Sequence, residues 1–370
     1  MKPINVFSMF DGMSCGQLAL KKAGIPVGTY HASEIDKPAM QITQKNFPYT
    51  FQMGDITKLE DWRLEIIRDE IGIDLVIGGS PCQGFSFAGN QLNFDDPRSK
   101  LFFDFVRVLK ILKPKYFLLE NVRMKKESQD IISEYLGVEP IAINSNLVSA
   151  QNRYRLYWTN IPFDIPEDKG IILADILEDG VTDREKSHCL DANYFKGGNL
   201  KSYFEKHRRQ LVFNNKGGAI RGRYNKDGKI QQQLELRPDD KTNTLTTVQK
   251  DNVIVSGCIQ VGEADLKGFD IIKRVYSPEG KAPTLTTMGG GHREPKVIVD
   301  ELTWRKLTVK ECERLQTVPD GYTEGVSNTQ RYKMLGNGWT VDVIAHILKG
   351  IKEEELEPQA IDDYYMALQD

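Results

Sequence analysis

The chain of 370 residues has no apolar run that approaches the roughly 18 residues of a membrane-spanning helix. Its first residues lack the basic start, long apolar core and small-residue cleavage site of a signal peptide. The five cysteines are scattered and never occur in Cys-x-x-Cys spacing, which disfavours a disulfide framework and a zinc site. We therefore expect a cytoplasmic protein with reduced thiols, no bound metal and no attachment to a membrane.

Net charge is also scarce, because the formal value is only −3. Its distribution is uneven. Residues 351–370 carry seven acidic side chains against one lysine, a net −6, so the rest of the chain carries +3. Residues 196–223 carry a net +7 and contain Tyr203, Phe204 and Phe213. This basic segment is either an ordinary solvated face or a surface that follows nucleic-acid phosphates.

Strand-like and helix-like patterns alternate through the first 160 residues. This alternation predicts an α/β fold with a doubly wound, mostly parallel sheet and an antiparallel hairpin at one edge. Strands are expected at 4–10, 29–35, 49–55, 73–80, 116–122, 139–148 and 155–161. Helices are expected at 15–23, 38–46, 60–71, 99–112 and 125–136.

The pattern changes near residue 165, where short β-like pieces rich in Gly, Lys, Asn and Thr begin. Lys186, Lys241 and Lys281 each begin a weakly repeated heptapeptide. These repeats are either related strand-turn units of a small domain or a coincidence among Thr-rich turns. Helical patterns resume at 308–317 and 341–355, so the first domain is predicted to be discontinuous.

The hexapeptide Gly-Gly-Ser-Pro-Cys-Gln at residues 78–83 directly follows an apolar run. The run predicts a buried strand, and the glycines and proline end it. Cys82 is therefore placed at the carboxyl end of a strand, where open α/β sheets bind their ligands. A cysteine is either a small buried hydrophobe or a nucleophile, and a glycine-rich turn is a poor core site. We favour the nucleophile.

Polar groups also follow the first three predicted strands. The turn between the first strand and helix, at residues 10–16, lets backbone approach a ligand. Glu34 ends the second strand, where an acidic residue typically accepts hydrogen bonds from ribose hydroxyls. Asp55 ends the third and could accept from an adenine amino group. Each acid alone could be an ordinary loop residue, but together they indicate an adenosine-containing cofactor.

A third group of residues has the chemistry of a clamp. Glu120 ends an apolar strand, and a buried carboxylate costs several kcal/mol unless it is paired. The neighbouring sequence supplies no evident partner. Gln151, Arg153 and Arg155 alternate, so they share one face of a strand. The two arginines belong either to a solvated strand edge or to a clamp for an anion or carbonyl group.

With these motifs assembled, the chain closely resembles the DNA cytosine-C5 methyltransferases. The resemblance covers nearly the whole chain and rests on eight motifs that occur in the order of the family. They lie at Phe10–Gly16, Ser33–Glu34, Gly54–Ile56, Gly79–Gln83 with Phe85–Ser86, Glu120–Val122, Gln151–Arg155, Arg305–Pro319 and Gly336–Asn337. Asp11 stands where bacterial members commonly have Ala, and Trp339 where Val is usual. Both features resemble the de novo branch of the family.

The resemblance implies a class I, Rossmann-like S-adenosylmethionine-dependent fold with a seven-stranded sheet and an inserted, smaller β-rich domain. We expect a catalytic, cofactor-binding domain at 1–168 and a target recognition domain at 169–325. A returning helix at 326–355 would complete the catalytic domain, and 356–370 would form an acidic tail. The implied partners are double-stranded DNA and, in a restriction-modification system, a cognate restriction endonuclease. We expect a monomer in a bacterial cell or phage-infected host.

The family mechanism then assigns the residues. Cys82 would add to C6 of a cytosine flipped out of the duplex, and the methyl group of S-adenosylmethionine would pass to C5. Glu120 would hydrogen-bond N3 and the exocyclic amine, and Arg155 would contact O2 with support from Arg153. The expected cofactor-binding residues are Phe10, Asp11, Gly12, Met13, Glu34, Ile35, Asp55, Ile56, Pro81, Leu101, Asn337 and Trp339. The expected substrate or DNA contacts are Gln83, Ser86, Gln91, Asn121 and Gln151, with segment 83–98 as a mobile lid.

Two alternatives stay open. One is an RNA cytosine methyltransferase of the same fold, which the long insert disfavours weakly. The other is a catalytically inactive, DNA-binding regulator, which the intact Cys82, Glu120 and 151–155 motif disfavour.

Overall fold

The structure is a computed structural model, and its side chains are described for most of the chain outside the insert. The described residues are 1–80, 100–198, 203, 206–213, 217–224, 230–236, 252–254, 260–263, 274–276, 296–297 and 304–351, with backbone alone from 217 to 297. The expected lid, the tail and the residues Pro81, Cys82, Gln83, Ser86 and Gln91 lie outside this part of the chain.

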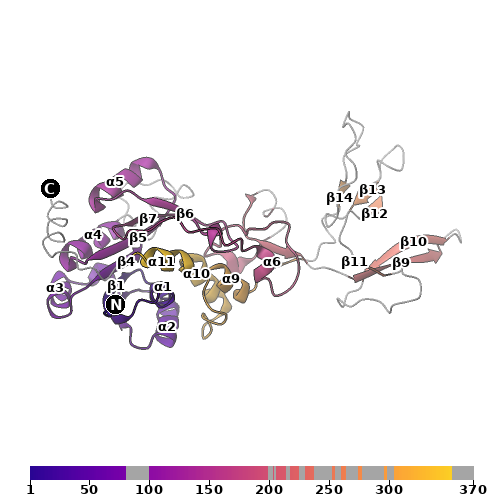
Figure 1. The fold of residues 1–370 in the computed structure, drawn as a ribbon. Coiled ribbons are helices and arrows are strands. Elements are labelled where there is room, and N and C mark those ends of the chain that lie inside the picture. The colour runs from indigo at the N-terminus through magenta and orange to yellow at the C-terminus, as the bar shows by residue number, and fades with distance from the viewer. Residues whose placement is uncertain are drawn as a thin grey trace.

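A seven-stranded sheet forms the centre of the first domain, in the order β3-β2-β1-β4-β5-β7-β6 (Figure 1). Its strands are β1 Ile4–Met9, β2 Val27–Ser33, β3 Phe51–Gln52, β4 Leu75–Gly79, β5 Tyr116–Val122, β6 Ile141–Asn144 and β7 Tyr154–Thr159. The ladders from β3 to β5 are parallel. β7 is antiparallel to β5 and to β6. The predicted mostly parallel sheet is confirmed, and its antiparallel hairpin is β6–β7, with β7 inserted beside β5.

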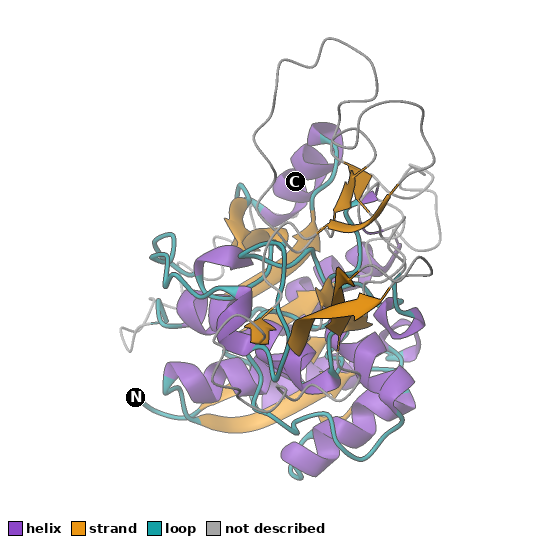
Figure 2. Ribbon diagram, turned by 90° about the vertical axis from the view of Figure 1, so that its right-hand side faces the viewer, coloured by secondary structure: helices purple, strands orange, loops and turns teal. Residues whose placement is uncertain are grey.

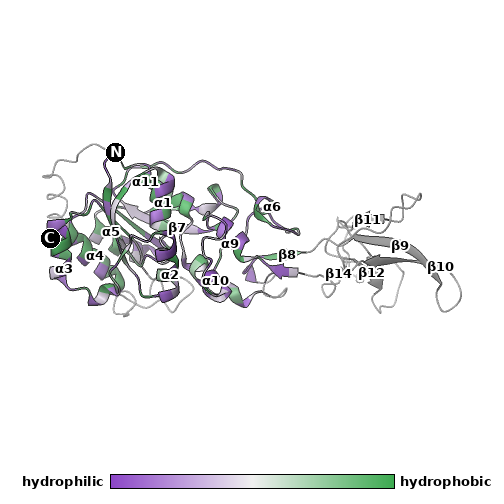
Figure 3. Cartoon of the chain, turned by 90° about the horizontal axis from the view of Figure 1, so that it is seen from below, coloured by the Kyte–Doolittle hydropathy of each residue, from purple (hydrophilic) through white to green (hydrophobic). Residues whose placement is uncertain are grey.

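Helices cover both faces of this sheet. Consecutive strand residues point to opposite sides, so neighbouring residues of one strand pack against different helices. Val6 and Leu118 belong to one hydrophobic cluster, and their neighbours Phe7 and Leu119 belong to another. The first cluster includes side chains of α1 (Cys15–Ala23), α2 (Lys37–Asn46) and α11 (Val341–Leu348). The second includes α3 (Asp61–Glu70), α4 (Lys100–Leu112) and α5 (Lys126–Leu136). The long apolar stretches of α4 and α11 are visible in Figure 3.

The end of the described chain returns to the first domain. Helices α9 (Val309–Leu315), α10 (Asn328–Asn337) and α11 contribute to the same cluster as β1. The Tyr322 hydroxyl donates to the carbonyl oxygen of Met13 at 2.7 Å. Leu173 and Val212 also belong to this cluster.

The insert leaves and returns through one small ladder. β8 (Leu211–Phe213) pairs antiparallel with β15 (Trp304–Lys306). Between them, β9 (Gly217–Tyr224), β10 (Ile230–Leu236) and β11 (Asn252–Ile254) form one sheet, and β12 (Gln260–Glu263), β13 (Arg274–Tyr276) and β14 (Lys296–Val297) form another. Both lie beyond β8, away from the seven-stranded sheet (Figure 1), and Figure 2 views the molecule from their side.

Two expectations about the insert are altered by the structure. The heptapeptide that begins at Lys186 does not form a strand. The Lys186 Nζ donates to the carbonyls of Asn146 and Ile171. The repeats at Lys241 and Lys281 lie outside the described residues. Tyr203 and Phe213 are buried together with Leu211 against Trp304. These two aromatic side chains of the basic segment therefore form a small core and do not face nucleic acid.

Candidate active site

The turn after β1 has an unusual backbone. Phe10, Gly12 and Ser14 have φ values of 57°, 59° and 63°, in the left-handed region that favours glycine. A Cβ atom added at Gly12 would meet nothing within 4 Å. The turn therefore leaves open space beside its backbone, as a close-approaching ligand requires.

Asp11 holds this turn from within. Its Oδ1 accepts hydrogen bonds from the hydroxyls of Ser8 at 2.6 Å and Tyr30 at 2.8 Å, and its Oδ2 from Ser14 at 2.7 Å. Burial raises the pKa of Asp11 to about 6, although these hydroxyls act in the opposite direction. Its carboxylate is thus committed to internal partners, so the expected cofactor contact falls to the backbone of the turn.

Glu34 and Ile35 present different surfaces at the end of β2. The Glu34 carboxylate accepts from the amides of Gly12, Ile35 and Asp36 at 2.7, 2.7 and 2.8 Å. Ile35 is 72% exposed, a large apolar side chain facing solvent beside that carboxylate. A carboxylate fixed next to an open apolar surface fits a ribose with its attached base, so these residues suit the adenosine of S-adenosylmethionine.

Asp55 caps its own turn. Its Oδ1 accepts from the amide and hydroxyl of Thr57 at 3.0 and 2.7 Å, and these bonds lower the pKa of Asp55. Met13 and Ile56 were expected to contact the cofactor, but their side chains are 1% and 3% exposed. Only the backbone of these two residues can face a ligand.

The last two expected cofactor residues lie on helices. Leu101 is half-buried in the first turn of α4, and Asn337 is exposed at the last residue of α10.

Glu120 finds the partner that the sequence did not show. The Arg155 Nε lies 2.8 Å from Glu120 Oε1, and the two side chains are 14% and 11% exposed. The attraction of Glu120 raises the pKa of Arg155 despite its burial. A buried carboxylate and a largely buried guanidinium are therefore paired at the carboxyl end of β5, beside the end of β4.

Trp339 makes the second contact with this carboxylate. Its indole Nε1 donates to Glu120 Oε2 at 3.1 Å. The sequence placed Trp339 with the cofactor, and the structure also places it against the residue expected to bind the target base.

Asn121 connects β5 with the segment that leads to Cys82. Its amide nitrogen donates to Ser80 Oγ at 3.0 Å, and its carbonyl oxygen accepts from the amide of Val122. Asn121 is 1% exposed, and its side chain fixes Ser80, two residues before Cys82. Its contact with the substrate stays a prediction.

Gln151 is also an internal residue. It is fully buried, and its amide nitrogen donates to the carbonyl of Leu315 at 2.8 Å and to Gln316 Oε1 at 2.9 Å. Its own oxygen accepts from the amide of Leu190. Gln151 therefore links three distant segments, and its contact with the substrate stays a prediction.

Arg153 supports the site from behind. It is 3% exposed and donates to the carbonyls of Leu190 at 3.0 Å, Gly336 at 3.2 Å and Gly338 at 2.9 Å. The role of Arg153 in supporting Arg155 stays a prediction. A Cβ atom at Gly336 would lie 2.3 Å from the backbone of Asp191, so only glycine allows this approach.

Cys189 was missed by the sequence analysis. Its Sγ lies 3.5 Å from Arg153 Nη1 and 4.0 Å from Arg155 Nη2. Desolvation raises the pKa of this thiol, but the two guanidiniums outweigh it and the pKa falls below its usual value. The only signal was the cysteine itself, which sits in the first copy of the weak repeat and was interpreted as part of it.

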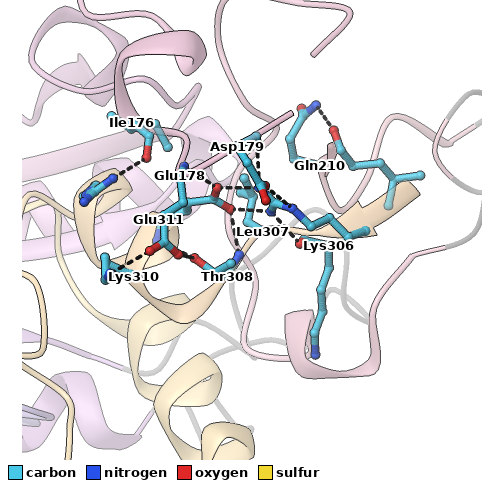
Figure 4. Close-up of polar contacts among 12 residues, drawn as sticks. Ile176, Glu178, Asp179, Gln210, Lys306, Leu307, Thr308, Lys310 and Glu311 are labelled. Carbon is cyan, nitrogen blue, oxygen red and sulfur yellow. Dashed lines mark hydrogen bonds and ion pairs between the residues drawn. The ribbon is translucent and has the colours of Figure 1, made fainter. Parts of the chain in front are cut away.

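The motif that begins at Arg305 joins the insert to the first domain (Figure 4). Glu311 is fully buried, and its two oxygens accept from Arg305 Nη1 and Nη2, each at 2.8 Å. The amides of Thr308 and Glu178 donate to the same carboxylate at 2.7 and 2.8 Å. The ends of the insert are thereby fastened to α9.

A model of the C-5 cytosine-specific DNA methylase family matches residues 4–353. The chain belongs to this family. It is therefore a DNA cytosine-C5 methyltransferase, and S-adenosylmethionine is the methyl donor. Among the described residues, no helix is long and apolar enough to cross a membrane.

Phage and bacterial proteins are similar to this methyltransferase. Orphan methyltransferase M.Rho11sI of Bacillus phage rho11s is 30% identical over 81% of this chain and 70% of its own length. Orphan methyltransferase M.SPBetaI of Bacillus phage SPbeta is 28% identical over 94% of this chain and 97% of its own length. Type II methyltransferase M.NlaIV of Neisseria lactamica is 29% identical over 93% of this chain and 97% of its own length.

Solved structures share the fold. The Entamoeba histolytica methyltransferase EhMeth has a TM-score of 0.60 at 15% identity, with 95% of this chain and 98% of that chain covered. A mutant of Spodoptera frugiperda DNMT2 has a TM-score of 0.56 at 18% identity, with 94% and 99% covered. At these identities the likeness concerns the fold alone.

Proposed function

We propose that this methyltransferase acts on a cytosine flipped out of duplex DNA, with Cys82 as its nucleophile and Glu120 and Arg155 as its clamp. The observation that carries the proposal is the buried Glu120–Arg155 pair at the carboxyl end of β5. Gly79 of β4 lies beside Glu120 in the sheet, and Cys82 follows three residues later in the chain. The nucleophile and clamp thus arise from adjacent strand ends.

In this proposal the Cys82 thiolate attacks C6 of the cytosine, and the electron pair displaced from the C5–C6 bond moves into the ring. Glu120 donates a proton to N3 and accepts a hydrogen bond from the exocyclic amine, and Arg155 donates to O2, so that these groups stabilise the charge on the ring. Arg153 keeps Arg155 in place. S-adenosylmethionine, when bound, supplies the methyl group that C5 accepts. Loss of the C5 proton then restores the double bond and releases Cys82.

The cofactor would lie along the ends of β1, β2 and β4. Glu34 would accept from the ribose hydroxyls, Ile35 would pack against the adenine, and the backbone of Gly12 would lie beside the turn. Pro81 and Leu101 would complete the pocket. Asp55 would have to give up part of its bonding to Thr57 in order to accept from the adenine amine.

Sequence recognition would belong to the small sheets between β8 and β15, with Gln83, Ser86 and Gln91 approaching the DNA from the loop after β4. We propose that the protein works as a cytoplasmic monomer. A cognate restriction endonuclease would cut the same sequence, so digestion of unmethylated and methylated host DNA with host extracts tests for that partner.

The direct test measures transfer of a tritiated methyl group to unmethylated duplex DNA and, in parallel, to tRNA. We expect incorporation into the duplex alone, and its loss in Cys82→Ser and Glu120→Gln. Both variants should still melt cooperatively and bind S-adenosylhomocysteine. Incorporation into tRNA alone would favour an RNA methyltransferase. Full activity of Cys82→Ser would show that Cys82 is not the nucleophile.

A trapping experiment isolates the covalent step. A duplex with 5-fluorocytosine cannot lose fluorine as a cation from C5, so the enzyme should stay attached to it after denaturation. Cys82→Ser should form no such complex.

A further inference from the structure

The Glu120 carboxylate is held from two sides by donors from opposite ends of the domain. Oε1 is 2.8 Å from Arg155 Nε, and Oε2 accepts from the Trp339 indole at 3.1 Å. Arg155 is 35 residues away along the chain, and Trp339 is 219 residues away, after the insert. Each oxygen therefore has one fixed donor.

The backbone of β4 leaves room for this contact by having no side chain there. A Cβ atom at Gly79 would lie 2.8 Å from Trp339 Nε1 and 3.1 Å from Glu120 Oε2. The hydrogen bond between Trp339 and Glu120 thus runs directly over a glycine, and any larger residue would push its two ends apart.

The segment that carries Trp339 is itself fixed. The carbonyl of Gly338 accepts from Arg153 Nη2 at 2.9 Å and from Gln316 Nε2 at 3.2 Å. Arg153 also reaches Cys189 Sγ, which lies 4.0 Å from Arg155. These contacts close a ring that runs from Glu120 through Arg155, Cys189, Arg153 and residues 338–339 back to Glu120.

We propose that Trp339 is a positioning residue that aims the Glu120 carboxylate at the target cytosine. This inference rests on the proposed role of Glu120 as the group that binds the base. A carboxylate has about four lone-pair positions. With Arg155 and Trp339 each occupying one, two are left for the edge of the cytosine: one accepts from the exocyclic amine, and the other carries the proton that Glu120 donates to N3, which is itself an acceptor. Fixing both oxygens removes the rotation that would spoil this alignment.

The experiment compares Trp339→Phe with Trp62→Phe. Trp339→Phe keeps an aromatic ring and removes the donor to Glu120. Trp62 is 53% exposed, and its indole donates to the Glu60 carboxylate on the surface. Trp62→Phe therefore removes the same kind of hydrogen bond far from the site and serves as the matched control. We expect Trp339→Phe to lower kcat about 10-fold or more, with little change in the KM for S-adenosylmethionine or in S-adenosylhomocysteine binding. Trp62→Phe should match the wild type.

A double-mutant cycle with Gly79→Ala tests the same hydrogen bond by a second route. Gly79→Ala keeps the indole but separates Trp339 from Glu120, so its effect on kcat should not add to that of Trp339→Phe. Additive effects would overturn the proposal. So would a normal kcat in folded Trp339→Phe, or a loss confined to cofactor KM, which would make Trp339 a cofactor contact only.

Failure of the inference can be separated from failure of the proposed function. If Glu120→Gln abolishes transfer and Trp339→Phe does not impair it, only the positioning role is wrong. If Glu120→Gln keeps full activity, the assignment of Glu120 itself is wrong.

Discussion

Arg155 and Glu120 are diagonal neighbours on β7 and β5. Glu120 lies opposite Tyr157, and Arg155 lies opposite Val122, so the two side chains meet on one face of an antiparallel ladder. The pair is buried, with Nε and Oε1 2.8 Å apart. Removing one partner would leave the other charge in a poorly solvated place.

Arg155→Ala should therefore lower the free energy of unfolding by about 3–5 kcal/mol, besides abolishing methyl transfer. Urea denaturation measures the first effect. The control is Lys126→Ala, which removes an exposed ion pair with Asp130 that solvent screens, so its loss of stability should be far smaller. Equal losses in the two variants would contradict the prediction.

Asp11 should make stability depend on pH. Burial raises its pKa from 3.8 to about 6, so between these values the folded protein holds more protons than the unfolded chain. The contribution of Asp11 to stability is then present at low pH and is lost as the pH rises through about 6. Relative to Asp11→Asn, the wild type should lose about 2 kcal/mol between pH 4 and 6.5. Parallel pH profiles of the two proteins would show that Asp11 does not titrate in this range.

Ile35 should contribute to cofactor affinity and not to folding. Because Ile35 is 72% exposed, Ile35→Ser should leave the melting temperature unchanged while weakening S-adenosylhomocysteine binding about 10-fold, measured by calorimetry. Tyr49→Ser is the control, since Tyr49 is 92% exposed and has no expected part in binding. Unchanged binding by Ile35→Ser would place the adenine elsewhere.

Glu311 should determine whether the insert stays attached in one position. Its buried carboxylate accepts hydrogen bonds from Arg305 and from two backbone amides. In Glu311→Gln the side-chain NH2 group replaces one of the two oxygens, so the N–H groups that bonded to that oxygen lose their acceptor. Glu311→Gln should lower the free energy of unfolding by about 3 kcal/mol. It should also speed proteolysis between β8 and β15 more than the exposed change Glu324→Gln does.

Most of the first domain could be predicted from its sequence because its strands are apolar runs ended by glycine or polar residues. β5 spans the expected residues 116–122. The single returning helix expected at 326–355 is two helices, and the bounds of α10 were not predicted because it is largely polar and buries only Tyr332, Met334, Leu335 and Gly336. Its start depends on Ser327, whose side chain accepts from the amide of Gln330.

The sequence predicted which residues belong to the site but not which of them contact one another. Arg155 and Trp339 were both expected there, but no periodicity relates a residue on β5 to one 219 residues later. The alternation of Gln151, Arg153 and Arg155 predicted that all three share one face of a strand. β7 begins only at Tyr154, and Gln151 instead bridges to Ser187.

The packing of α1 against α11 affects how the protein is made. Buried residues of α1, among them Leu18 and Leu20, share their cluster with Val343 and Ile344 of α11. At roughly 5–20 residues per second, a ribosome needs about 15 to 65 s to reach α11 after completing α1. During that interval the apolar side of α1 has no covering helix. Chaperone supply and translation speed should therefore govern the yield of this protein in an expression host.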